Sequence, residues 1–97
     1  MKRIIRPGVW TEISDAVQWY EGKEPGLGAR FLDSLEKALL RIEENPYLYQ
    51  QVDPEIRRGF MDPFPYGVYY AILGDRIEVL AVVNDARDPV VWKTRRL

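Results

Sequence analysis

Apolar residues in the first half of the chain recur every three or four positions, the spacing of a helix that buries one face. The first stripe follows Pro7, a residue suited to a first helical turn, and comprises Val9, Ile13, Ala16, Val17 and Tyr20. A second stripe follows the glycine-containing stretch 22–28 and comprises Leu27, Phe31, Leu35, Leu39 and Ile42. Because Pro46 disfavours helical geometry at Asn45, the pattern predicts an antiparallel helical hairpin over about residues 7–45.

The second half changes to short runs rich in β-branched and aromatic residues, which indicate strands. With a similar run at the N-terminus, they predict strands at residues 2–6, 56–61, 66–73 and 76–83, and the polar stretch 45–54 is expected to be a loop. Strict alternation in strand 76–83 separates Ile77, Val79, Ala81 and Val83 from Glu78, Leu80 and Val82. Both faces of the strands are largely apolar, so we expect the hairpin to cover one face and a further cover on the other.

The order of these elements predicts an α+β fold: strand, helix, helix and a three-stranded antiparallel meander, with the helical hairpin packed on one face of the sheet. A length of 97 residues is that of one domain, which we expect to span residues 1–97. No apolar run is long enough for a membrane span, and the charged N-terminus is too short for a signal peptide. Since there is also no cysteine, we expect a cytoplasmic protein with no membrane partner.

The composition excludes several kinds of chemistry. The sequence has no histidine and no cysteine, which removes Ser-His-Asp and Cys-His catalysis, proton transfer by histidine and the usual zinc ligands. Gly26-Leu27-Gly28 lacks the third glycine and the preceding strand of a phosphate-binding loop. We therefore expect neither a metal nor a cofactor. The net charge is −1, but Lys93, Arg95 and Arg96 make the last residues basic, either as a solvated tail or as a contact for an acidic partner.

A series of motifs runs through the chain: Trp19-Tyr20, Leu27-Gly28-Ala29-Arg30-Phe31-Leu32, Asn45-Pro46, Arg57-Arg58, Phe64-Pro65-Tyr66-Gly67-Val68-Tyr69-Tyr70, Arg87-Asp88-Pro89 and Trp92. In this order and spacing, the chain resembles the RelE/ParE superfamily of bacterial toxins from type II toxin–antitoxin pairs. Within that superfamily it is similar to the ParE-like plasmid stabilisation members. The resemblance covers nearly the whole chain.

The resemblance implies a small cytoplasmic growth inhibitor that a cognate antitoxin silences by wrapping it with a helix and an extended segment. Operator DNA would then be contacted only through the antitoxin. A homodimer is a further possible assembly. Members of the superfamily act in two ways, as ParE-like inhibitors of DNA gyrase or as RelE-like ribosome-dependent mRNA endonucleases. A third reading is a non-toxic member retained as a binding module.

Two arginines are the first candidates for a functional site. Arg87 directly follows the last predicted strand, and its guanidinium could fork onto a phosphate or a carboxylate; the alternative is a surface ion pair with Asp85 or Asp88. Arg58 lies on the predicted strand 56–61, where one sheet face could bring it to Arg87.

A nuclease would need a base as well as these cations. Glu78, Tyr69 and Lys93 are the candidates, and a tyrosine or lysine would need a pKa shifted far from its usual value of about 10. ParE-like members often carry a histidine where Asn84 stands, and an asparagine cannot carry a proton at neutral pH. We therefore favour a gyrase-binding inhibitor over an enzyme.

The remaining expectations concern contacts with partners. Binding to the target is expected at the end of the last strand and in the basic arm, through Arg87, Trp92, Lys93 and Arg95. Contacts with the antitoxin are expected at Trp10, Trp19 and Tyr69. The alternatives are that the two tryptophans contact a second copy or cover the helix pair, and that Tyr69 belongs to the sheet core.

Overall fold

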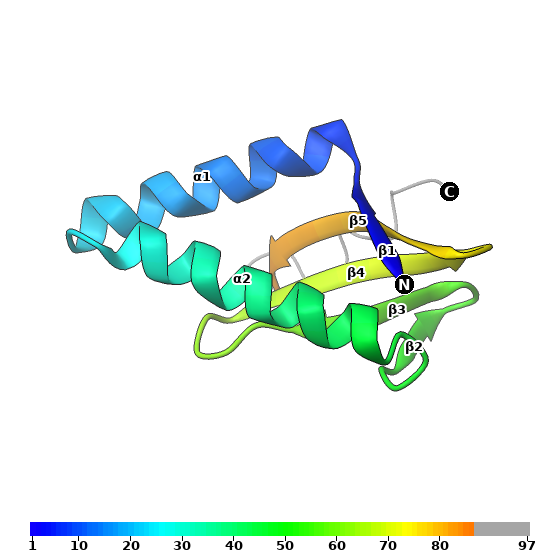
Figure 1. Ribbon diagram of the computed structural model, residues 1–97. Helices are drawn as coiled ribbons and strands as arrows, with labels where there is room; N and C mark the ends of the chain where they lie inside the picture. The colour runs from blue at the N-terminus through cyan, green and yellow to red at the C-terminus, as the bar shows by residue number, and fades with distance from the viewer. Residues whose placement is uncertain (87–97) are drawn as a thin grey trace.

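Figure 1 shows the computed structural model, which describes residues 1–86. Its elements are β1 (Lys2–Ile5), α1 (Pro7–Lys23), α2 (Leu27–Glu44), β2 (Gln51–Asp53), β3 (Ile56–Phe60), β4 (Tyr66–Leu73) and β5 (Arg76–Asn84). The four residues expected to bind the target lie outside the described residues: Arg87, Trp92, Lys93 and Arg95.

Within residues 1–86 the strands form a sheet in the order β1-β5-β4-β3-β2. The predicted meander is present as the antiparallel strands β3, β4 and β5, and β1 pairs with β5 in parallel. The predicted α+β fold is therefore confirmed. The sequence pattern does not predict β2, which lies in the expected loop. This edge strand has only three residues and mostly exposed side chains, so its alternation of polar and apolar residues is too short to indicate a strand.

The two helices form the predicted hairpin and cover one face of the sheet (Figure 1). α2 packs closely on β3: Ile42 of α2 lies so near Gly59 of β3 that a Cβ atom at Gly59 would be only 2.7 Å from its Cδ1 atom. The apolar stripes of both helices face the sheet and form the main core with it, including Val9, Ile13, Ala16, Phe31, Leu35, Leu39, Ile42, Val68, Tyr70, Val79 and Val82.

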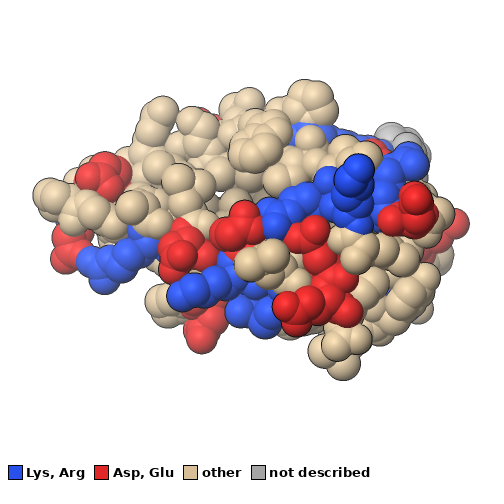
Figure 2. Space-filling view, in the orientation of Figure 1, with Lys and Arg blue, Asp and Glu red and all other residues tan. Residues whose placement is uncertain are grey.

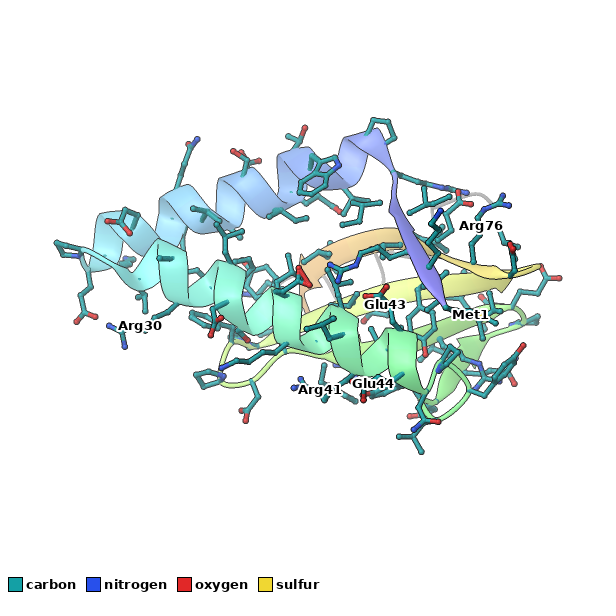
Figure 3. The ribbon with its side chains drawn as sticks, viewed as in Figure 1. Met1, Arg30, Arg41, Glu43, Glu44 and Arg76 are labelled. Carbon is teal, nitrogen blue, oxygen red and sulfur yellow. The ribbon has the colours of Figure 1, made fainter. Side chains whose placement is uncertain are left out.

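Polar contacts hold β1 beside the end of α2. The N-terminal amine of Met1 donates a hydrogen bond to the carbonyl oxygen of Glu43 at 3.0 Å, and Figure 3 shows these two residues near each other. Arg3 forms ion pairs with Glu36 and with the Glu43 side chain. The first strand is thereby fixed to the helical layer as well as to the sheet.

Two glutamates of α1 bind backbone N–H groups of other segments. The carboxylate of Glu21 accepts hydrogen bonds from the N–H groups of Gly26 and Gly28, which closes the turn between the helices. Glu12 accepts a hydrogen bond of 3.2 Å from the N–H of Val82 on β5. The pairing of β1 with β5 ends at Val79, so Glu12 binds a backbone N–H of β5 that β1 does not reach.

A register shift in the sheet inserts one extra residue into β5. Tyr69 lies opposite Ala81, whereas the next residue, Tyr70, lies opposite Val79. Leu80 is therefore the extra residue of a β-bulge. Bulges reverse the faces to which the following side chains point, because alternation resumes one position out of step.

The assignment of residues 81–83 from strict alternation is wrong for this reason. Val82 packs in the core on the helical side, while Ala81 and Val83 pack on the opposite face. The same reversal brings Asp85, just after β5, to the face away from the helices, where it contacts Tyr69. The bulge thus decides which polar groups meet at the end of the sheet.

The face away from the helices carries its own buried cluster, formed by Ile56, Tyr69, Ala71, Leu80, Ala81 and Val83. Most of the large apolar side chains that are exposed within residues 1–86 lie on the helices or in the connection from α2 to β2. Surface for a partner is therefore found chiefly on the helical side. No helix within residues 1–86 has both the length and the apolar character that crossing a membrane requires.

Candidate functional site

Three polar side chains meet on the sheet face away from the helices. Arg58 on β3 and Tyr69 on β4 are directly opposite each other in the ladder. Asp85 accepts a hydrogen bond of 2.6 Å from the Tyr69 hydroxyl through Oδ1, and its Oδ2 forms an ion pair with Nη2 of Arg58. We call Arg58, Tyr69 and Asp85 the Asp85 cluster.

The chain provides a specific place for the Asp85 carboxylate. The Asp85 N–H donates a hydrogen bond of 3.0 Å to the carbonyl oxygen of Pro65, which fixes the backbone at the end of β5. A Cβ atom at Gly67 would lie 2.8 Å from Oδ1 of Asp85 and 2.9 Å from Oδ2. A side chain at position 67 would therefore displace the carboxylate, so glycine is required there for reasons of space.

A cavity of about 350 Å³ opens beside the Asp85 cluster and is lined by Arg58, Phe60, Met61, Phe64, Pro65, Tyr66, Asp85 and Ala86. The Arg58 guanidinium stacks over the ring of Phe60, with its carbon 4.2 Å from the ring centroid, and Phe60 is half exposed. The site therefore combines an aromatic wall with one guanidinium and one carboxylate.

The electrostatics of the Asp85 cluster favour an ion pair beside a neutral phenol. Burial and the hydrogen bond to Asp85 raise the pKa of Tyr69 to about 12. Burial acts to lower the pKa of Arg58, but the hydrogen bond and the charge of Asp85 outweigh it, so the pKa of Arg58 is raised. Arg58 is thus a cation that a carboxylate neutralises, and Tyr69 keeps its proton at neutral pH.

The other candidate base lies apart from this cluster. Glu78 is next to β1 in the sheet, opposite Ile4. Its carboxylate forms an ion pair of 2.6 Å with Arg6 and approaches Arg76 at 3.7 Å. The structure therefore does not bring Glu78 to Arg58, and Arg87 and Lys93 lie outside the described residues.

The helical layer offers a different kind of surface. Trp10 is 55% exposed and lines a groove of about 440 Å³ between the helices and β1, together with Arg3, Ile5, Leu32, Asp33, Leu35, Glu36 and Leu39. Figure 2 shows that α1 presents mostly uncharged side chains in this view, whereas charged side chains gather over α2 and β1. We call the groove beside Trp10 the hairpin groove.

Trp19 lies on another side of α1. It is 54% exposed and lines a smaller cleft of about 160 Å³ toward β5, with Glu12, Asp15, Ala16, Tyr66, Val82, Val83 and Asn84. Lys23 lies over its ring at 4.3 Å. The two tryptophans therefore face different clefts, and Tyr69, expected with them as an antitoxin contact, is only 2% exposed and offers no open surface.

Comparison with known proteins indicates the family to which the chain belongs. The family model described as the ParE toxin of the type II toxin–antitoxin system parDE matches residues 4–89. The chain belongs to this family. A search of curated proteins gave no match. Among solved structures, a chain of the chromosomal ParDE TA system from P. aeruginosa aligns with a TM-score of 0.65 and 10% sequence identity, over 87% of this chain and 95% of that chain. At such low identity, the likeness shows the fold alone.

Two positions of this ParE family member acquire roles that the sequence does not indicate. Asn84, which stands where a histidine is frequent, accepts a hydrogen bond of 2.9 Å from the N–H of Ala86 through its side-chain oxygen, so it shapes the turn after β5. From the sequence, Asp85 is expected only as a surface partner of Arg87, but in the structure it pairs with Arg58. The one available signal is its place directly after the last strand, and the bulge at Leu80 hides which face it joins.

Proposed function

We propose that this ParE family member inhibits growth by binding a protein target, DNA gyrase, rather than by cleaving messenger RNA, and that a cognate antitoxin neutralises it in the cytoplasm. One observation carries the choice between the two mechanisms. Arg58, the described cation best placed for phosphate chemistry, is paired with Asp85 beside a tyrosine that retains its proton.

RNA cleavage needs a base for the 2′-hydroxyl, an acid for the leaving oxygen and positive charge at the phosphate. With a pKa of about 12, Tyr69 is ionised in roughly one molecule in 10⁵ at pH 7. Glu78 forms an ion pair with Arg6 where β5 borders β1, away from Arg58. These arrangements suit a folded scaffold for binding better than a general-base site.

Binding to a protein asks for shape, apolar area and a few placed charges. The cavity beside the Asp85 cluster supplies an aromatic wall at Phe60 and a neutralised charge pair. Together with the resemblance to ParE-like members, this supports gyrase as the target. Arg87, Trp92, Lys93 and Arg95 remain our proposal for further target contacts, on the argument from sequence alone.

The hairpin groove is our proposed antitoxin site. It lies between the helices and β1 and is lined by leucines and Trp10, with charged residues at Arg3, Asp33 and Glu36. An amphipathic helix laid into a groove buries its apolar face in this manner and pairs its edges with such rim charges. Trp19, in the cleft toward β5, is proposed as a separate contact for the extended part of the antitoxin.

Induced expression of the chain in growing cells tests the proposed function. We expect growth to stop, plasmid DNA to lose negative supercoiling and messenger RNA to stay intact, because gyrase is blocked and no transcript is cut. Co-expression of the product of the adjacent reading frame should restore growth. Codon-positioned cuts in messenger RNA with normal supercoiling would establish the nuclease instead, and unimpaired growth at confirmed soluble expression would establish a non-toxic binding module.

A further inference from the structure

Arg58 without its partner would have the features of a phosphate-binding group. A guanidinium forks onto phosphate oxygens with paired N–H donors. Arg58 lines an open cavity, stacks on the ring of Phe60, and has its Nε buried without a hydrogen-bond partner among the described residues. A cation beside an aromatic ring is an arrangement that single-stranded nucleic acid binds by phosphate contact and base stacking.

Asp85 opposes that use of Arg58. Its carboxylate forms an ion pair with Nη2 of Arg58, so a negatively charged group already lies against the guanidinium that would bind a phosphate. Three features hold the carboxylate there: the Asp85 N–H bond to Pro65, the hydroxyl of Tyr69, and the absence of a side chain at Gly67. The contact is therefore part of the fold and not a chance surface ion pair.

We infer that Asp85 is a specificity-determining residue that excludes phosphodiesters from Arg58 and leaves the cavity to an uncharged group of a protein partner. This inference rests on the proposed function, in which the target is a protein and not RNA. A phosphate that approached Arg58 would have to displace a carboxylate of like charge, and the displaced carboxylate would lose both of its partners. Removing that one charge should convert the cavity into a site that accepts RNA.

The test compares binding of a short fluorescein-labelled oligouridylate to the whole chain and to Asp85→Asn at low salt. Asparagine keeps the size of the side chain and can still accept the Tyr69 hydrogen bond, but it no longer neutralises Arg58. We expect the affinity of Asp85→Asn for the RNA to be at least tenfold higher than that of the unaltered protein. The gain should fall as salt is added, because it rests on a phosphate contact.

Two controls separate this effect from a general gain of positive charge. Glu78→Gln changes the net charge by the same amount but removes an ion pair with Arg6, which directly follows β1 and does not line the cavity. It should not change RNA binding. The double variant Arg58→Ala, Asp85→Asn should return to the affinity of the unaltered protein, because the cation that accepts the phosphate is then missing.

An unchanged affinity in folded Asp85→Asn overturns the inference, as does a gain that persists in the double variant or appears equally in Glu78→Gln. If Asp85→Asn does not fold, Asp85→Ser is measured in its place with the same outcomes. Failure of the inference and failure of the proposed function give different results. A gain in RNA affinity with no effect of the unaltered protein on gyrase would leave the inference standing and refute the target, and flat RNA binding with inhibited gyrase would do the reverse.

Discussion

At the scale of single residues, Tyr69 and Asp85 show how one hydrogen bond links a core position to a functional surface. The hydroxyl is buried with its ring, and its proton is held by the carboxylate that neutralises Arg58. A buried hydroxyl that bonds to a charged group adds about 1.5–3 kcal/mol to stability. The surrounding fold therefore depends on a contact that also sets the charge of the cavity.

Tyr69→Phe tests this link through pH. A raised tyrosine pKa means that the fold holds the neutral phenol, so the stability that it contributes is present below the ordinary value of 10 and is lost as the pH rises through about 12. Tyr70 has a pKa raised to about 12 as well. In an ultraviolet absorbance titration of the six tyrosines, we expect the step near pH 12 to shrink by about half in Tyr69→Phe. A step near pH 12 of unchanged height, with the lost absorbance confined to the step near pH 10, would contradict the assignment.

The residue scale also shows where reasoning from sequence ends. Arg58 is found from its place on an alternating strand, because alternation needs only local spacing. The sequence does not predict Asp85 as its partner. The extra residue at Leu80 reverses the faces of β5 after that position, and the hydrophobic pattern of the sequence does not indicate this bulge. Gly67 gives a weaker hint: a glycine within an apolar strand suggests a close approach of another group, here the Asp85 carboxylate.

At the scale of elements, the layers are held together by carboxylates at their ends. Glu36 pairs with Arg3 and ties α2 to β1, and Glu21 binds the turn between the helices. Hydrogen bonds donated by Arg3 lower the pKa of Glu36, and those donated by the N–H groups of Gly26 and Gly28 lower the pKa of Glu21. Both ties therefore need the ionised carboxylate.

Acid should loosen these two ties. A lowered pKa means that the contribution to stability is present above the ordinary value of 4.5 and is lost as the pH falls through the lower value of the folded protein. We expect the urea midpoint of the unaltered protein to fall steeply below about pH 4.5, and that of Glu21→Gln, Glu36→Gln to fall less steeply from a lower starting value. Equal slopes for the two proteins would show that these carboxylates do not govern acid stability.

The elements themselves follow from the sequence to different extents. Long periodic stripes and the prolines and glycines that break them are local signals, so both helices and the meander are predicted near their observed bounds. β2 is missed because its three residues belong to an edge strand with little burial, where pairing to β3 and not side-chain pattern defines the strand. The parallel pairing of β1 with β5 joins the two ends of the described chain, which no local pattern can indicate.

At the scale of the whole molecule, the two exposed tryptophans offer a matched pair of tests for antitoxin binding. Trp10 lines the hairpin groove and Trp19 lines the cleft toward β5, and both are about equally exposed. If an antitoxin helix fills the hairpin groove, Trp10→Ala should weaken binding of the adjacent gene's product by a factor of ten or more, since a buried tryptophan anchor is worth about 2 kcal/mol or more.

Isothermal titration calorimetry with each variant gives the comparison. Trp19→Ala should reduce the affinity less, because its cleft is smaller and its lining is more polar. Circular dichroism should show both variants folded, as the two side chains lie largely outside the core. Unchanged affinity in Trp10→Ala, with a large loss in Trp19→Ala, would move the antitoxin helix from the hairpin groove to the cleft beside β5.

The central claim is that the molecule acts by binding gyrase, and a supercoiling reaction measures this most directly. Purified protein is titrated into relaxed plasmid, gyrase and ATP, and the topoisomers are separated on a gel. We predict a dose-dependent loss of supercoiled product, with or without an accumulation of cleaved DNA, and recovery when the antitoxin is added. Complete supercoiling in the presence of a large molar excess of folded protein would contradict the account.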